Sequence, residues 1–134
     1  MSALPTRLGR ARERGSATVE FVLVLPLVLT VAVAILQLGL LVKDQLVVQE
    51  SARAGARQAS VSTDDATVIQ AADDAAPSLD GTKLDVSIQR DPGAGAPVSV
   101  SVTYHAEVTL PIISWLFPST VDLSSTAVMR GETG

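Results

Sequence analysis

One stretch of the chain decides the fold: residues 14–42, which read RGSATVEFVLVLPLVLTVAVAILQLGLLV. From Phe21 to Val42 this stretch holds 22 residues without a formal charge, which we call the apolar segment. A helix of that length, at about 1.5 Å rise per residue, is roughly 33 Å long and can cross the core of a bilayer. A buried core helix is the alternative, but 134 residues do not readily hide a helix that is apolar on every face. We therefore predict a transmembrane helix over residues 16–42.

The residues before the apolar segment are basic. Four arginines lie between residues 7 and 14, and Glu13 alone offsets them. Arginines within about 15 residues of a span stay on the cytoplasmic side. We therefore expect a single-pass protein of the cell membrane, with its N-terminus in the cytoplasm and the chain from Lys43 onward outside.

Glu20 is the unusual residue of this region, because it stands directly before the apolar segment. A carboxylate at the bilayer centre costs about 2.5 to 3.5 kcal/mol on insertion scales, and one at the membrane edge also loses hydration. The N-terminal end of a helix favours a nearby negative charge by about 0.3 to 1 kcal/mol. We therefore expect a positively charged group near Glu20, in addition to the N-terminal end of the helix.

Residues 15–21, GSATVEF, resemble the signal of type IV pilins and pseudopilins. That signal has a basic leader, a cleavage-site glycine, four residues, a glutamate, an aromatic residue and an apolar helix. The resemblance implies that a prepilin peptidase cuts between Gly15 and Ser16, so that residues 1–15 are a cleaved leader. It also implies an assembly role for Glu20 and Phe21, in which Glu20 pairs with an ammonium group that cleavage creates and sets the position of an incoming subunit.

Two other interpretations of the N-terminus remain. A secretory signal peptide with a cut after residues 32–34 (AVA) would leave an apolar new terminus at residues 35–42. An uncleaved membrane anchor, in which Gly15 and Glu20 occur by chance, is the stronger alternative. The pilin-like signal is preferred to both.

A second motif follows the apolar segment, at residues 50–57 (ESARAGAR). From spacing alone, an Ala-rich helix with solvated charges is the simplest interpretation, although small residues four apart also let helices approach closely. The motif is similar to the Ala-Arg-x-Gly-Ala-Arg stretch of TadE-like proteins, small pseudopilin-like proteins of the tight-adherence, or Flp pilus, machinery. The resemblance marks Arg53, Gly55, Ala56 and Arg57 as family positions.

The remaining chain predicts a small α+β domain. A long helix from Ser16 to about Ser60 is followed by a second, starting at a hydroxyl cap near residues 62–65 and ending near Ala76. Alternation with a period of two then indicates strands, a hairpin followed by a third strand from Val121 to Arg130. The predicted fold is a long N-terminal transmembrane helix that extends into an extracytoplasmic domain, residues 43–134, helical over 43–76 and β over 84–130. This domain holds a second short helix and a three-stranded antiparallel sheet, whereas residues 1–15 are expected to be unstructured.

Residues 110–118, LPIISWLFP, form another apolar stretch, too short to span a bilayer. Trp115, Leu116 and Phe117 are candidates for a docking patch or a membrane-interface foot, since exposed apolar patches and interfacial Trp serve these ends. A loop that plugs the small core explains the stretch equally well.

Composition argues against catalysis. The chain has no Cys, and only 3% of its residues are aromatic, although pockets are usually lined with rings. Its single histidine, His105, falls in the polar phase of a strand and is expected at the surface. We expect no catalytic residue, no metal and no cofactor.

Residues 43–134 carry six basic and twelve acidic side chains, a net charge of −6, which argues against nucleic acid as a partner.

These observations lead to one functional hypothesis and one alternative. The first is a minor pseudopilin, TadE-like, that acts in assembly of a tight-adherence pilus after processing by prepilin peptidase. Its partners would be that peptidase, other pilin or pseudopilin subunits, membrane proteins of the assembly machinery and membrane lipid, and it could be incorporated into the pilus. The alternative is an unprocessed single-span adaptor that binds an envelope partner through its extracytoplasmic domain.

Overall fold

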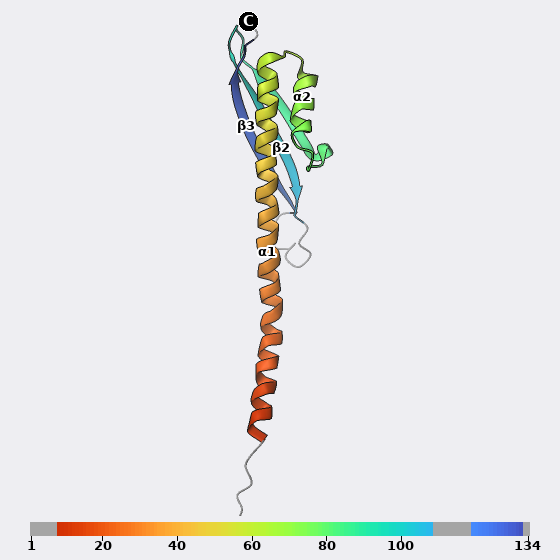
Figure 1. The fold of residues 1–134 in the computed structure, drawn as a ribbon, viewed down its shortest axis with the longest axis vertical. Coiled ribbons are helices and arrows are strands. Elements are labelled where there is room, and N and C mark those ends of the chain that lie inside the picture. Colours follow the sequence, from red (N-terminus) through yellow and green to blue (C-terminus); the bar gives the residue numbers. More distant parts are fainter. Residues whose placement is uncertain (1–7, 109–118, 133–134) are drawn as a thin grey trace, which may run out of the picture. The chain divides into compact units, whose positions relative to one another are not determined.

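The computed structural model describes residues 8–108 and 119–132, with side chains from residue 15 onward. The chain divides into two compact units, Met1–Gln37 and Leu38–Gly134, and we call the second the head. The predicted α+β fold class is confirmed: a long N-terminal apolar helix, a second short helix and a three-stranded antiparallel sheet (Figure 1). The elements are α1 (Leu8–Val61), α2 (Asp65–Asp74), the short 3-10 helix η1 (Gly81–Lys83), β1 (Leu84–Arg90), β2 (Pro97–Glu107) and β3 (Thr120–Arg130).

Helix α1 begins earlier than the sequence predicted. Residues 8–14 were expected to be unstructured, but the helix already starts at Leu8. Three of these seven residues are Arg, and Leu, Ala and Glu occur once each, all of which favour helices. The segment contains no proline, so the helix extends backwards without a break. The helix is also continuous through Pro26, where the hydroxyl of Thr30 donates a 2.7 Å hydrogen bond to the Pro26 carbonyl.

Helix α2 is capped by a carboxylate and not by a hydroxyl, so the predicted type of cap was wrong. Asp64 has an extended backbone, and its Oδ1 accepts a hydrogen bond from the Ala66 N–H at 3.1 Å. Ser62 lies before this cap and accepts a bond from the Asp64 N–H at 3.2 Å. Aspartate is as good an N-cap as serine and adds a charge that the helix dipole favours.

The sheet has the order β1-β2-β3, and both pairings are antiparallel. Val86 lies opposite Val102 in the first pairing, and Val102 lies opposite Ser125 in the second. The β1–β2 connection turns at Gly93 and Gly95, whose φ values of 125° and 72° are ones that a side chain would disfavour. This confirms the predicted hairpin and the third strand.

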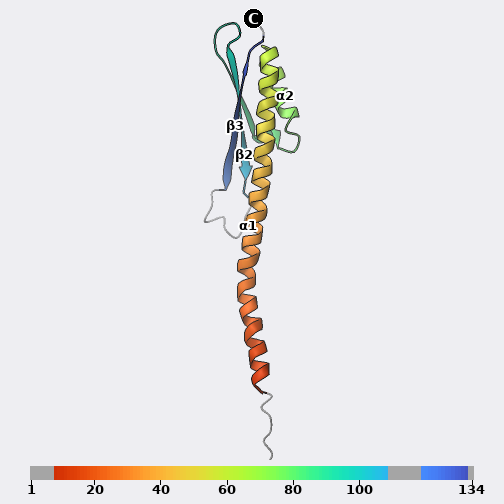
Figure 2. The ribbon, with the colours of Figure 1, turned by 60° about the vertical axis from the view of Figure 1, so that its left-hand side comes forward.

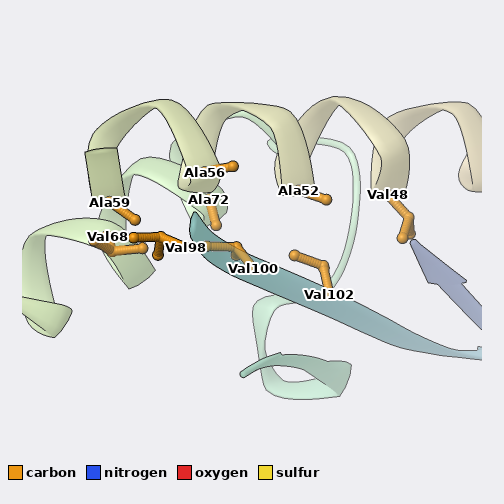
Figure 3. Packing of buried hydrophobic residues seen from close by; sticks show 9 residues of the cluster. All are labelled: Val48, Ala52, Ala56, Ala59, Val68, Ala72, Val98, Val100 and Val102. Atoms are coloured by element: carbon orange, nitrogen blue, oxygen red, sulfur yellow. The ribbon is translucent and has the colours of Figure 1, made fainter. Parts of the chain in front are cut away.

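In the head, α1 and α2 lie together on one face of the sheet, which gives two layers (Figure 2). The core between them is built from small residues on the helices and valines on β2, as Figure 3 shows. Its buried members are Val48, Ala52, Ala56, Ala59, Val68, Ala72, Val98, Val100 and Val102. Because alanine side chains are short, the helix backbones come close to the sheet, and β-branched valines on the strand fill the remaining space. Both helices therefore cover the hairpin.

Candidate functional site

The predicted processing site lies on exposed helix. Gly15, Ser16, Glu20 and Phe21 all belong to α1 and are exposed, Phe21 by 65%. Ser16 and Glu20 are four residues apart in a helix, so they lie on the same side, one turn from each other. A new amino group on Ser16 would therefore arise within one helical turn of the carboxylate.

Gly15 is not required by packing. Apart from the neighbouring backbone of its own helix, a Cβ atom built at this position would meet no described atom within 4 Å. Glycine inside a helix costs about 0.5 to 1 kcal/mol relative to alanine, because it loses more backbone freedom. Its place in α1 thus makes local unwinding easier, and a peptide bond must be unwound before a protease can bind it in an extended form.

Most of the apolar segment is exposed, and only Thr30, Ala34, Gln37 and Leu41 are half-buried. Leu23, Leu27, Ile35 and Leu38 are each more than 60% exposed. Within the described part of the chain, one helix is long and apolar enough to cross a membrane, over Gly15–Val61 of α1. Such a surface needs lipid or other apolar helices around it, because water would solvate it at a high cost in free energy.

The motif at residues 53–57 divides between the inside and the outside of the head. Ala56 is completely buried, and at Gly55 a Cβ atom would be 2.9 Å from Val100 Cγ1 and 3.4 Å from Ala72 Cβ. Arg53 and Arg57 point away from this core and are exposed. The small residues therefore pack α1 on the sheet of the same chain. The simple interpretation of an Ala-rich helix with solvated charges holds only for the side of α1 that carries Arg53 and Arg57, which we call the arginine side.

Two polar contacts fix α1 against α2. The buried Ser51 hydroxyl donates a 2.8 Å hydrogen bond to the Ala72 carbonyl. At the other end, Arg90 of β1 donates from Nη1 to the Ala59 carbonyl at 3.0 Å and from Nη2 to Asp65 Oδ1 at 2.9 Å. These contacts show that α1 and α2 are antiparallel, since Ala72 lies beside Ser51, whereas Asp65 lies near Ala59.

The arginine side of α1 borders a groove of about 310 Å³. Its lining comes from five residues of α1 and one of β3: Glu50, Arg53, Ala54, Arg57, Gln58 and Met129. Among the described residues, one long ion pair lies within it, with Arg53 Nη1 3.8 Å from Glu50 Oε2. The groove does not follow from the sequence pattern, because it depends on where β3 comes to lie.

A histidine bridge on the outer face of the sheet was also missed. His105 of β2 bonds through Nδ1 to Asp122 Oδ1 on β3 at 2.6 Å, and through Nε2 to Asp85 Oδ2 on β1 at 3.0 Å. These bonds, first to Asp122 and then to Asp85, raise the pKa of His105 above its ordinary value. His105 does lie at the surface, as predicted, yet it connects all three strands. The three residues fall in the polar phase of their strands, but only the register of both pairings brings them together.

Other predicted features are placed as follows. Trp115, Leu116 and Phe117 lie outside the described residues. Asp73 and Asp74 are exposed at the end of α2. In residues 8–108 and 119–132, no group of three or more His, Cys, Asp or Glu side chains is arranged to hold a metal ion.

Comparison with known families gives one match. Residues 15–57 match the model of a family described as TadE-like protein. The match begins at Gly15, ends at Arg57, and so contains the candidate cleavage position, Glu20, the apolar segment and the motif that packs α1 on the sheet. No curated protein and no solved structure matches the chain. The resemblance inferred from the sequence is confirmed over this segment.

Proposed function

From the TadE-like character of residues 15–57, we propose that the chain is a non-enzymatic, minor pseudopilin-like subunit that acts in assembly of a tight-adherence pilus. The observation that carries the proposal is the extent of the match, which runs from Gly15 through the apolar segment into the head. A plain membrane anchor has no need for a glycine and a glutamate ahead of its span, nor for a specific motif after it.

Membrane insertion supports this function. The exposed apolar residues of α1 match the thickness of a bilayer, and the four arginines between residues 7 and 14 keep the N-terminus in the cytoplasm. In this orientation, Gly15 and Ser16 face the cytoplasm at the membrane surface, and residues 43–134 are outside the cell membrane.

Processing by a prepilin peptidase is the first chemical step of the proposed function. Hydrolysis of the peptide bond after Gly15 releases residues 1–15 and leaves an ammonium group on Ser16. This cation lies one helical turn from Glu20 and can compensate the carboxylate, within one subunit or from a neighbouring one. Compensation lowers the cost of holding Glu20 beside lipid and ties the position of one subunit to that of the next.

The head supplies a stable surface outside the membrane. Its core is closed by the small residues of α1, so the buried positions Gly55 and Ala56 contribute to stability, while Arg53 and Arg57 are available to partners. The proposed partners are other pilin or pseudopilin subunits and membrane proteins of the assembly machinery.

The experiment that tests the proposal is the intact mass and N-terminal sequence of the membrane-extracted protein. The full chain is produced with an active prepilin peptidase, with an inactive peptidase variant, and without either. A mature terminus at Ser16 that depends on the active peptidase is the expected result. Retention of residues 1–15 under all conditions would contradict the proposal and favour an unprocessed anchor that serves as an adaptor.

A Gly15→Leu variant is the matched control. Gly15 lies outside the head, so the substitution leaves the folded head intact. It should nevertheless block cleavage, because a large side chain prevents close approach of the protease to the backbone.

A further inference from the structure

The groove between α1 and β3 presents positive charge on an acidic head. Residues 43–134, which hold all the charged side chains of the head, carry a net charge of −6. In the groove, Arg53 is held by Glu50 only at 3.8 Å, and both side chains are about two-thirds exposed, 67% and 65%. Arg57 forms no ion pair with any residue that the structure describes. Ala54 and Met129 add apolar surface beside the two arginines.

The outer side of α2 carries the opposite charge. Ile69 is 40% exposed, and Asp73 is exposed one helical turn after it. Residues four apart lie on the same side of a helix, so Ile69 and Asp73 form a short strip with an apolar and an anionic end. Asp73 makes no ion pair within the described part of the chain.

The strip and the groove lie on opposite sides of α1. The groove includes Met129 of β3, whereas α2 lies nearest to β1, at the other edge of the sheet. Figure 1 shows β3 and α2 on either side of α1 in the head. One copy of the chain therefore cannot bring its own strip into its own groove.

Along the axis of α1, the strip and the groove place their charged and apolar residues in the same order and at the same height. Ala72, next to Asp73, lies beside Ser51 and Gly55, which places Asp73 level with Arg53. Ile69 lies one turn further toward the C-terminal end of α1. Met129 also lies toward that end, because it pairs with Val98, which packs near Ala59 and Val68 (Figure 3).

We propose that the α2 strip of one copy docks into the α1–β3 groove of a second copy. Ile69 packs against Ala54 and Met129, and Asp73 forms an ion pair with Arg53, aided by Arg57. The pairing needs no shift along the helix axis, so copies stand side by side with parallel α1 helices. Because the two surfaces differ, each copy keeps one free strip and one free groove, and the contact can repeat into a row.

This inference deepens the proposed assembly role and rests on it for its purpose, but the contact itself requires no cleavage. It can therefore be tested in the full, unprocessed chain. If cleavage is observed and the contact is not, this inference fails while the proposed function stands. If the contact is observed without cleavage, the proposed processing fails while this inference stands.

Engineered cysteines test the contact, since the natural chain has no Cys. Copies with Ala54→Cys and copies with Ile69→Cys, carrying different tags, are produced together and oxidised in membranes. We expect a disulfide-linked dimer that contains both tags, and little dimer from either variant alone. A chain with both cysteines should give a ladder of larger products. Ser87→Cys, on the outer face of β1, replaces Ile69→Cys as the control and should give no mixed dimer.

Charge reversal tests the specificity of the contact. Arg53→Glu with Arg57→Glu in the Ala54→Cys copy should abolish the cross-link, and Asp73→Arg in the Ile69→Cys copy should restore it. Circular dichroism checks that each variant keeps its fold. The inference is overturned if folded copies give no mixed dimer, if Ala54→Cys copies link only to each other, or if the groove links to a different protein in preference to a second copy.

Discussion

Gly55 of α1 lies so close to Val100 of β2 that a Cβ atom on the glycine would stand 2.9 Å from Val100 Cγ1. The same atom would be 3.4 Å from Ala72 Cβ on α2, and Val100 is completely buried. A methyl group at position 55 therefore cannot be accommodated unless the strand or the helix shifts. Gly55 is the residue that lets α1 approach the sheet and α2 at one point.

We expect Gly55→Ala to destabilise the head. Overpacking costs about 1 to 3 kcal/mol, and the better helix propensity of alanine returns about 1 kcal/mol, which leaves a net loss of about 1 kcal/mol. Thermal unfolding of the full chain in detergent, followed by circular dichroism, measures the loss. Gly39→Ala is the control, since a Cβ there has no atom within 4 Å, and it should be no less stable than the natural chain. A Gly55→Ala variant that melts at or above the natural temperature would contradict the close contact.

The Gly55–Val100 contact can be isolated by a second substitution. Val100→Ala removes the Cγ1 atom that the new methyl group meets, although it also lowers stability by itself. The loss caused by Gly55→Ala should then be smaller in the Val100→Ala chain than in the natural chain. A double-mutant cycle measures this difference, and an equal loss in both chains would show that the two positions are not coupled.

Arg90→Lys should loosen the connection between the two helices. The planar guanidinium reaches the Ala59 carbonyl and Asp65 together, whereas a single ammonium group cannot match that fork. Since Asp65 is 63% exposed, we expect a loss of only about 1 kcal/mol. Hydrogen exchange of the α1–α2 turn should increase. Arg130→Lys, at an exposed position near the end of β3, should leave the exchange unchanged, and equal effects of both variants would refute a specific role for Arg90.

Most of the fold could be predicted from the sequence, because the patterns that indicate its helices and strands involve only neighbouring residues. An uncharged run as long as Phe21–Val42, and alternation with a period of two in the strands, each need only neighbouring residues to be recognised. The start of α1 at Leu8 and the Asp64 cap were missed, because several nearby residues serve equally well as a helix start or a cap.

The surfaces of the head could not be predicted in the same way. The α1–β3 groove and the His105 bridge join residues that are far apart in the sequence, such as Arg57 with Met129 and Asp85 with Asp122. Their positions depend on the strand register and on the face of the sheet that the helices cover. Neither follows from composition or local spacing.

The His105 bridge makes stability depend on pH. Its bonds to Asp122 and Asp85 raise the pKa of His105, so the folded head favours the cationic ring. The bridge stabilises fully below the unfolded-state pKa of about 6.5 and is lost as the pH rises through the raised pKa of the folded state. We therefore expect the melting temperature to be lower at about pH 8.5 than at about pH 6.

His105→Gln should remove this pH dependence, since glutamine does not titrate in this range. Asp122→Asn should weaken it, because the closest carboxylate partner is lost. Asp91→Asn, an exposed aspartate in the β1–β2 connection, serves as the control and should leave the natural pH dependence in place. A melting temperature of the natural chain that is constant or rises over this range would refute the bridge in solution.

Substitution of Glu20 separates assembly from membrane anchoring. Removing one exposed carboxylate does not weaken the apolar segment, so Glu20→Ala should accumulate in the membrane and still lose residues 1–15. It should not support piliation, because no anion remains to pair with the ammonium group of Ser16 of a subunit.

Glu20→Gln keeps the shape of the side chain without its charge and should behave like Glu20→Ala. Val19→Ala, at an exposed neighbouring position, should leave piliation normal. The amount of pilus sheared from cells, compared with the amount of protein in membranes, measures both effects. Normal piliation with Glu20→Ala would mean that the carboxylate has no part in assembly, whereas loss of piliation with Glu20→Ala but not with Glu20→Gln would assign the role to hydrogen bonding instead of charge.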